Sequence, residues 1–132
     1  AAIEESGVQL TFADPEEMSI LAGRAEGERM LAEADLPDAI FAMNDLLAVG
    51  LLQALVMRGG IDVPGDVALI GYDDIDFCAN AVVPLSSVRQ PSVEMGTRAV
   101  ELLELALLEG AAHQHQHVQL RPELIVRAST VA

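Results

Sequence analysis

Residues 63–74 read VPGDVALIGYDD, and this stretch decides the fold class. A Pro-Gly pair near its start predicts a tight turn. The apolar run over residues 67–70 is unbroken, which is typical of a strand buried on both faces. The run ends in Gly-Tyr followed by Asp73 and Asp74, so that polar groups stand where the strand finishes. A buried strand of this kind predicts a parallel sheet.

Strands and helices alternate on both sides of this stretch. A second apolar run, residues 39–43, precedes a helix at 46–57, and a strand at 86–89 precedes a helix at 92–109. Such alternation with short connections predicts an α/β fold, in which helices cover a parallel sheet as three αβα layers. The predicted strands are few for a complete sheet, so we expect the layers to be incomplete.

Other elements are predicted with weaker signals. They are a strand at 8–12, a helix at 15–34 with Asp14 as its cap, a short helix and loop at 75–84, and terminal strands at 118–120 and 124–126. Gly23 and Gly27 lie on the buried stripe of the first helix, where close approach to a neighbouring strand would explain them. Residues 1–6 resemble the end of a helix, which indicates missing sequence upstream.

Composition excludes several classes of protein. The length of 132 residues fits one domain, and 52% of the residues are hydrophobic. Seven basic residues against twenty-one acidic ones give a net charge of −14, which disfavours direct nucleic-acid binding. No apolar run approaches the roughly 20 residues that span a membrane. The start of the chain does not resemble a signal peptide.

The helix at 46–57 has one polar residue, Gln53. A helix lying on a sheet normally keeps a polar outer face, so something is expected to cover this one on its second side. One explanation is deep burial within a single chain. The other, which we favour, is a homodimer interface through Val49, Leu52 and Val56, because exposed apolar patches of this size are uncommon on monomers.

The helix at 92–109 carries a similar apolar stripe. Its members are Val93, Gly96, Val100, Leu103 and Leu107, widened by Leu102, Leu105 and Leu108. We expect it to pack on a sheet.

Two strand ends carry groups suited to ligand recognition. Ligands of open parallel sheets bind at the carboxyl ends of strands, where Asn44-Asp45 and Asp73-Asp74 stand. An amide and a carboxylate suit a neutral polyol, because Asn both donates and accepts while Asp accepts hydroxyl hydrogens. Asp45 is interpreted as a helix cap, Asp73 as a ligand group, and Asp74 as a cap or turn residue. Asn44 fits either a ligand or a loop-shaping role.

The remaining reactive side chains form no catalytic set. Cys78 is not part of a local histidine or aspartate constellation and is expected to be inert. His113, His115 and His117 alternate, a spacing compatible with metal, but a solvated loop is the preferred interpretation. No nucleophile motif or phosphate loop is present. We therefore predict no enzyme, no cofactor and no metal.

Several spaced motifs together resemble the effector-binding region of LacI/GalR-type transcriptional regulators. They are AIFAMND at 39–45, AVG at 48–50, VPGDVALIGYDD at 63–74, PLSSVRQP at 84–91 and LIVRAST at 124–130. The likeness runs from about residue 14 to residue 130. It implies a periplasmic-binding-protein-like (type I) fold, of which this chain is the C-terminal part.

The resemblance also implies a division of the chain. Residues 1–90 would form mainly the C-terminal lobe, residues 91–115 a helix crossing to the N-terminal lobe, and residues 116–132 the terminal strands. The helix-turn-helix that reads DNA is absent from this chain.

Site residues follow from the same resemblance. The positions of Asn44, Asp73 and Gln90 commonly face effector, and Met18 stands where relatives often place an aromatic that stacks on the ligand. Ser92 stands where some relatives make an apolar contact. Val49 and Ala81 match positions at the family's dimer interface.

The expected function is effector sensing in a cytoplasmic, homodimeric regulator. A carbohydrate is the favoured effector, and operator DNA would be bound only through the absent domain, with no role for a membrane. The alternative is a periplasmic sugar-binding protein of an ABC transporter, built on the same fold. The apolar helix at 46–57 weighs against that alternative.

Overall fold

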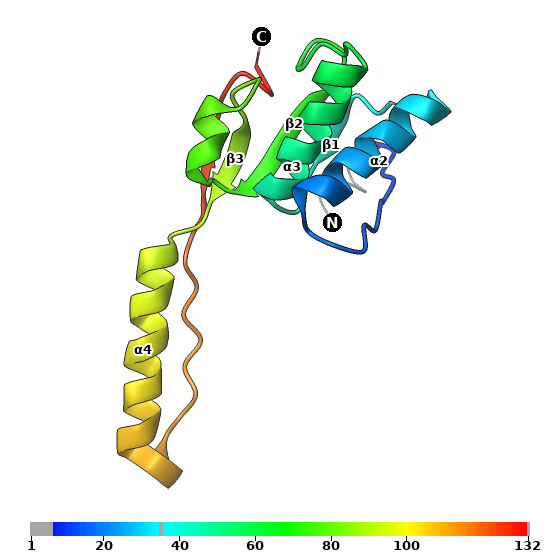
Figure 1. Cartoon of the computed structure of the whole chain (residues 1–132). Coiled ribbons are helices and arrows are strands. Elements are labelled where there is room, and N and C mark those ends of the chain that lie inside the picture. Colours follow the sequence, from blue (N-terminus) through cyan, green and yellow to red (C-terminus); the bar gives the residue numbers. More distant parts are fainter. Residues whose placement is uncertain (1–6, 35, 132) are drawn as a thin grey trace.

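A computed structural model describes residues 7–34 and 36–131 (Figure 1). It has two parts, which we call the sheet lobe and the arm. The sheet lobe holds the sheet and its covering helices, and the arm (residues 91–122) consists of a long helix and the segment running back beside it. The predicted helix end at residues 1–6 lies outside the described residues.

The sheet has four strands in the order β1 (Ala39–Phe41), β2 (Ala68–Asp73), β3 (Ser86–Arg89) and β4 (Glu123–Ile125). The first three are parallel, as predicted, while β4 pairs antiparallel with β3. This confirms the α/β class and its mainly parallel sheet. Strand β2 is longer than expected, because its pairing with β3 continues to Asp73.

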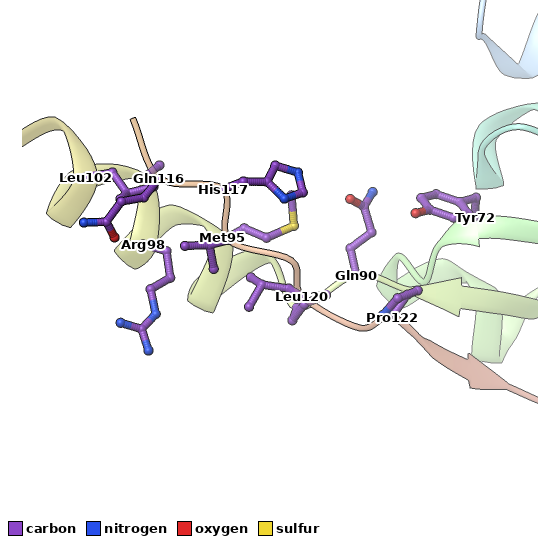
Figure 2. A pocket seen from close by; sticks show the side chains of 12 residues that line it. Tyr72, Gln90, Met95, Arg98, Leu102, Gln116, His117, Leu120 and Pro122 are labelled. Carbon is purple, nitrogen blue, oxygen red and sulfur yellow. The ribbon is translucent and has the colours of Figure 1, made fainter. Parts of the chain in front are cut away.

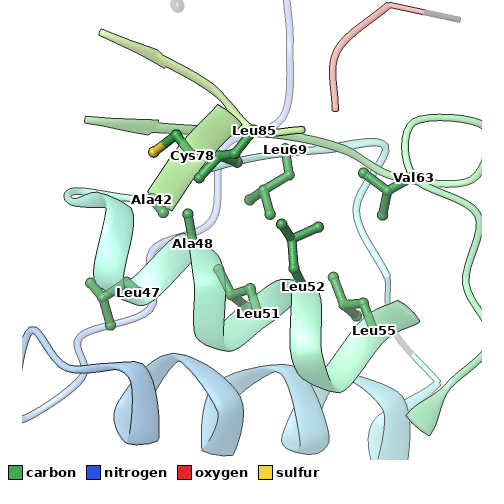
Figure 3. Close-up of a cluster of buried hydrophobic side chains, with 10 residues drawn as sticks. All are labelled: Ala42, Leu47, Ala48, Leu51, Leu52, Leu55, Val63, Leu69, Cys78 and Leu85. Carbon is green, nitrogen blue, oxygen red and sulfur yellow. The ribbon is translucent and has the colours of Figure 1, made fainter. Parts of the chain in front are cut away.

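Helix α3 (Asp45–Leu52) continues as a π-helical turn, η1 (Gln53–Arg58), and together they match the predicted helix. Leu52 and Leu55 of this helix pack with Leu69 of β2 and Leu85 before β3 (Figure 3). All four side chains are at most 1% exposed. This aliphatic contact between helix and sheet forms the core of the sheet lobe.

Helix α2 (Ile20–Glu33) lies on the outer side of α3 (Figure 1). Glycines allow the two helices to approach closely: a Cβ added at Gly23 would lie 2.2 Å from the backbone oxygen of Leu47, and one at Gly50 would lie 2.2 Å from that of Ile20. The expectation that Gly23 and Gly27 approach a strand was wrong, because their neighbour is a helix.

The predicted start of this helix was also wrong. Asp14 and Pro15 precede it, but the helix begins at Ile20, and Ser19 is its cap, with Oγ accepting the amide of Ala22 at 3.2 Å. Residues 8–12 and 118–120 form no strand. A short strand needs a paired neighbour to be stable, and the described chain offers none to either segment.

The last described residues fix β3 to β2. Ser129 is fully buried and its Oγ donates to the carbonyl of Leu69 at 2.6 Å, while the amide of Ser86 donates to the same Oγ at 2.8 Å. Ser86 Oγ in turn accepts the amide of Arg127 at 2.7 Å. The segment that contains Arg127 and Ser129 is therefore part of the sheet lobe.

The arm contains α4 (Ser92–Glu109), which has the predicted bounds, and a short 3₁₀ turn, η3 (Gly110–Ala112). It extends away from the lobe, and the chain returns along it to β4 (Figure 1). No residue of α4 is buried. Its apolar stripe is thus uncovered in the described structure.

Candidate functional site

The carboxyl ends of β1, β2 and β3 meet at one edge of the sheet, because these strands are parallel neighbours. Asn44 follows β1, Asp73 ends β2, and Gln90 follows β3. The structure therefore brings three of the four predicted ligand residues to the same edge, as expected from the strand ends for Asn44 and Asp73.

Asp73 and Gln90 form a direct pair at this edge. Gln90 Nε2 donates to Asp73 Oδ1 at 2.7 Å, and the Asp73 side chain is exposed. Asp73 has φ 109°, a conformation that residues with a Cβ rarely adopt. Strained backbone of this kind persists only where the surroundings enforce it, and it is common at ligand sites.

Asn44 and Met18 form a second contact. Asn44 Nδ2 donates to the carbonyl of Met18 at 3.2 Å, and its Oδ1 accepts the amide of Leu47 at 2.8 Å. Asn44 is therefore the N-cap of α3, and the prediction that Asp45 is the cap was wrong. Met18 is 52% exposed, and its role as a ligand contact stays a prediction.

Asp45 is instead a buried carboxylate. Its Oδ1 accepts from Ser87 Oγ at 2.7 Å and its Oδ2 accepts from the amide of Ile75 at 2.9 Å. A Cβ added at Gly71 would lie 2.1 Å from Asp45 Oδ1, so only glycine admits the carboxylate here. Asp45 thus joins the start of α3 to the turn after β2 and to Ser87 within β3.

Asp74 lies in the turn after β2, as predicted, with φ 56° and a side chain 3% exposed. It forms ion pairs with Arg89 (Oδ2 to Nη2, 2.6 Å) and Arg127 (Oδ1 to Nη2, 2.7 Å). Burial opposes its ionisation, but hydrogen bonds and charge from Arg127 and Arg89 outweigh burial and hold the pKa of Asp74 below its usual value.

Sequence reasoning missed Ser87, Arg89 and Arg127. A weak signal existed for the arginines, because they are two of only seven basic residues and each stands at or just after the end of a short predicted strand. Their nearness to Asp74 is visible only in the structure. Nothing local marks Ser87, which is buried between strands.

A groove of about 440 Å³ lies where the arm leaves the lobe (Figure 2). Tyr72 and Gln90 line its lobe end, and Met95 and His117 line it along the arm. Gln90 therefore faces both Asp73 and this groove. Ser92 begins the helix beside it.

The residues predicted for a dimer interface lie in different environments. Val49 is 4% and Leu52 is 1% exposed, while Val56 and Ala81 are half-buried. Helix α2 covers the second side of α3 and supports the explanation by burial within one chain. The argument that α3 lacks a cover was therefore wrong, and an interface through these residues stays a prediction.

The other reactive groups have structural surroundings. Cys78 is fully buried, and burial followed by the hydrogen bond and charge of Asp45 raises its pKa to about 12, so the thiol stays protonated. His113 contacts Glu109 at 2.9 Å and the ring of His115 edge-on. Across the described part of the chain, no group of three or more histidine, cysteine or acidic side chains could hold a metal ion.

Residues 7–34 and 36–131 contain no helix that is both long enough and apolar enough to cross a membrane.

A family model described as periplasmic binding protein-like domain matches residues 2–130. The transcriptional regulator DegA of Bacillus subtilis is 37% identical over 131 residues, which cover 98% of this chain and 38% of the relative. The ribose operon repressor of Escherichia coli is 38% identical over 101 residues, covering 76% of this chain and 30% of the relative. The chain thus spans less than two fifths of these curated relatives.

The Lac repressor dimer, solved bound to operator and the anti-inducer ONPF, has a TM-score of 0.86 to this structure. It is 27% identical, and the match covers 98% of this chain and 44% of the repressor chain. The match therefore includes both the sheet lobe and the arm.

Proposed function

We propose that this chain is the effector-binding part of a transcriptional regulator. The premise is that the chain belongs to the periplasmic binding protein-like family and matches its LacI-type regulators. The whole protein would bind operator DNA through a domain outside this chain and would act in the cytoplasm as a homodimer. Effector would change the balance between two arrangements of that dimer.

The observation that carries this proposal is the pair of Asp73 and Gln90. Asp73 is held in a rare backbone conformation, and its exposed carboxylate meets Gln90 at 2.7 Å. Strand-end geometry of this kind places acceptors and donors on a rigid support, as ligand sites require.

A carbohydrate is the effector class that suits these groups best. Asp73 keeps an oxygen to accept a hydroxyl hydrogen, and Gln90 keeps its carbonyl oxygen for another. Asn44 is a weaker candidate, because its amide oxygen and nitrogen already bond the backbone of Leu47 and Met18. Met18 offers apolar contact to the ligand without the flat face of an aromatic ring.

Two other functions have less support. A sugar-binding protein of a transporter would share the fold, but the named relatives are transcriptional regulators. An enzyme would need a reactive group at the site. The Asp73 carboxylate is bonded to the Gln90 amide, the Cys78 thiol is buried and protonated, and the named relatives are transcriptional regulators. We therefore infer that the protein is not an enzyme.

The homodimer is proposed on the match to the Lac repressor dimer. The predicted interface includes Ala81, Val56, Val49 and Leu52, of which only the first two are partly exposed. Ala81→Glu is a sharper test than Val49→Glu, because a charge at the buried Val49 would disrupt the lobe itself. Analytical ultracentrifugation of the full-length protein should show a weakened dimer for Ala81→Glu, and an unchanged mass would argue against the interface.

The effector proposal is tested by a thermal-shift screen of the full-length protein. The panel holds D-ribose, D-glucose, sucrose and lactose, with adenine and guanine as non-sugar members. At least one sugar is expected to raise the melting temperature, and Asp73→Ala should remove that rise. Asp66→Ala is the control, since its carboxylate lies in a loop away from the site and bonds the amide of Asp62. Stabilisation by a nucleobase alone would reject the carbohydrate class.

A further inference from the structure

The backbone turn that presents Asp73 is held by side chains that do not themselves reach the cleft. Asp73 and Asp74 have φ 109° and 56°, two consecutive left-handed residues. The amide of Asp74 donates to Ser87 Oγ at 3.0 Å, and the amide of Ile75 donates to Asp45 Oδ2 at 2.9 Å. Both bonds require the turn to have this conformation.

Asp45 and Ser87 are linked to each other and hidden from solvent. Each is 0% exposed, and Ser87 Oγ donates to Asp45 Oδ1 at 2.7 Å. The hydroxyl therefore donates to the carboxylate and accepts from the turn, and both carboxylate oxygens are used. Ser87 is the register partner of Gly71, which explains why a side chain at Gly71 would collide with Asp45.

We propose that Asp45 and Ser87 are positioning residues for the effector cleft. They fix the amides of Asp74 and Ile75, and so set the direction in which the Asp73 carboxylate points. This inference rests on the proposed function of Asp73 and adds two residues that act on effector only through the backbone.

Burial alone does not account for this arrangement. A buried carboxylate loses its hydration, and an apolar side chain of similar volume would fill the space without that loss. The hydrogen bonds of Asp45 offset this loss, and two of them hold the turn: one is made directly to the amide of Ile75, and another is made to Ser87, which bonds the amide of Asp74. The ion pairs of Asp74 with Arg89 and Arg127 fix the same turn through its side chain.

The test uses the side-chain amide of Gln90 as a reporter, because its bond to Asp73 Oδ1 exists only when Asp73 is correctly directed. Full-length protein labelled with ¹⁵N-glutamine is examined by NMR, with the signal assigned by its loss in Gln90→Glu. Asp73→Ala supplies the position of the unbound amide. Asp45→Asn and Ser87→Ala should each move the Gln90 signal most of the way to that position.

Hydrogen exchange gives a second readout on the same variants. In Asp45→Asn an amide nitrogen replaces one oxygen, so the side chain cannot accept from both Ile75 and Ser87. Exchange of the Asp74 and Ile75 amides should rise at least tenfold, while exchange in Ala39–Phe41 stays unchanged. Asp66→Asn, which alters a carboxylate bonded to the amide of Asp62 at 2.9 Å, is the matched control and should change neither readout.

A Gln90 signal that stays at its wild-type position in both variants would overturn the inference, even if the two amides exchange faster. If Asp45→Asn does not fold, Ser87→Ala decides alone, because it removes one hydroxyl and leaves the carboxylate bonded to Ile75. The reporter needs no effector. Failure of every sugar to bind would therefore count against the proposed function, while the Gln90 signal still decides the positioning role.

Discussion

The helices α3 in the sheet lobe and α4 in the arm have similar apolar sequence patterns, but most apolar side chains of α3 are buried and most of those of α4 are exposed. In the lobe, α3 lies between α2 and the sheet, and Ala48, Leu52 and Leu55 are at most 1% exposed. In the arm, Leu103 and Leu107 of α4 are 59% and 75% exposed. An apolar stripe thus predicts a helix in both parts, but it does not say whether the described chain covers the stripe.

The glycines of the two parts differ in the same way. Gly23 and Gly50 lie where two helix backbones touch, whereas Gly96 of α4 has no atom within 4 Å of an added Cβ. The lobe is therefore specified by contacts between distant segments, and the arm helix mainly by its own residues. Four matched pairs of variants test this contrast.

The largest difference is expected between two leucines. Leu52→Ala should lower the free energy of unfolding by about 2–5 kcal/mol, because it leaves a cavity between α3 and the sheet. Leu107→Ala should change it by less than about 0.5 kcal/mol in this chain, because the side chain is exposed. Urea unfolding measures both. A similar loss for Leu107→Ala would contradict the contrast, and a loss confined to the full-length protein would show that another segment covers α4.

Alanine at two helical glycines should give effects of opposite sign. Gly50→Ala places a Cβ 2.2 Å from the Ile20 oxygen and should cost about 1–3 kcal/mol, because α2 must shift. Gly96→Ala should stabilise the helix by up to about 1 kcal/mol, through helix propensity alone. Thermal unfolding and far-UV circular dichroism check the pair. Equal effects would mean that α2 can move away from α3 without loss.

Acid should reveal how much the ion pairs of the buried Asp74 carboxylate stabilise the lobe. The pKa of Asp74 is lower in the folded protein than in the unfolded chain, so its contribution to stability is present above the unfolded value of about 4. That contribution is lost as the pH falls through the folded pKa. Asp74→Asn should flatten the dependence of the unfolding free energy on pH below about 4. Glu101→Gln, in an exposed pair with Arg98 on α4, should leave the dependence unchanged.

The smallest difference concerns the starts of two helices. Ser19→Ala removes the cap of α2 and should cost about 1 kcal/mol. Helix α4 begins after Pro91 without a side-chain cap, so Ser92→Ala should change stability by less than about 0.5 kcal/mol. Asp14→Ala should be equally neutral, because Asp14 precedes the helix without capping it. A loss for Asp14→Ala instead of Ser19→Ala would restore the original prediction.

The candidate site was predictable where strand ends alone place a residue. Asp73 ends a parallel strand, and any parallel sheet brings such strand ends to one edge. Gln90 was predicted only from the resemblance to a known family. The roles of Asn44 and Asp45 were less predictable, because both are good capping residues and the sequence does not say which one turns inward. The missing side chain at Gly71 determines that Asp45 turns inward, because it leaves the space that the Asp45 carboxylate occupies.

The order of strands and helices, the bounds of α4 and the polar residues at the end of β2 could be predicted from consecutive residues, because periodicity and turn residues act within a few positions of the chain. Consecutive residues did not predict that α2 covers α3, that Ser19 caps α2, or which groups Asp45 bonds. Asp45 meets Ile75 and Ser87 across 30 and 42 positions of sequence. Contacts between such distant residues exist only once the sheet has formed, so the tertiary structure alone decides how Asp73 is held.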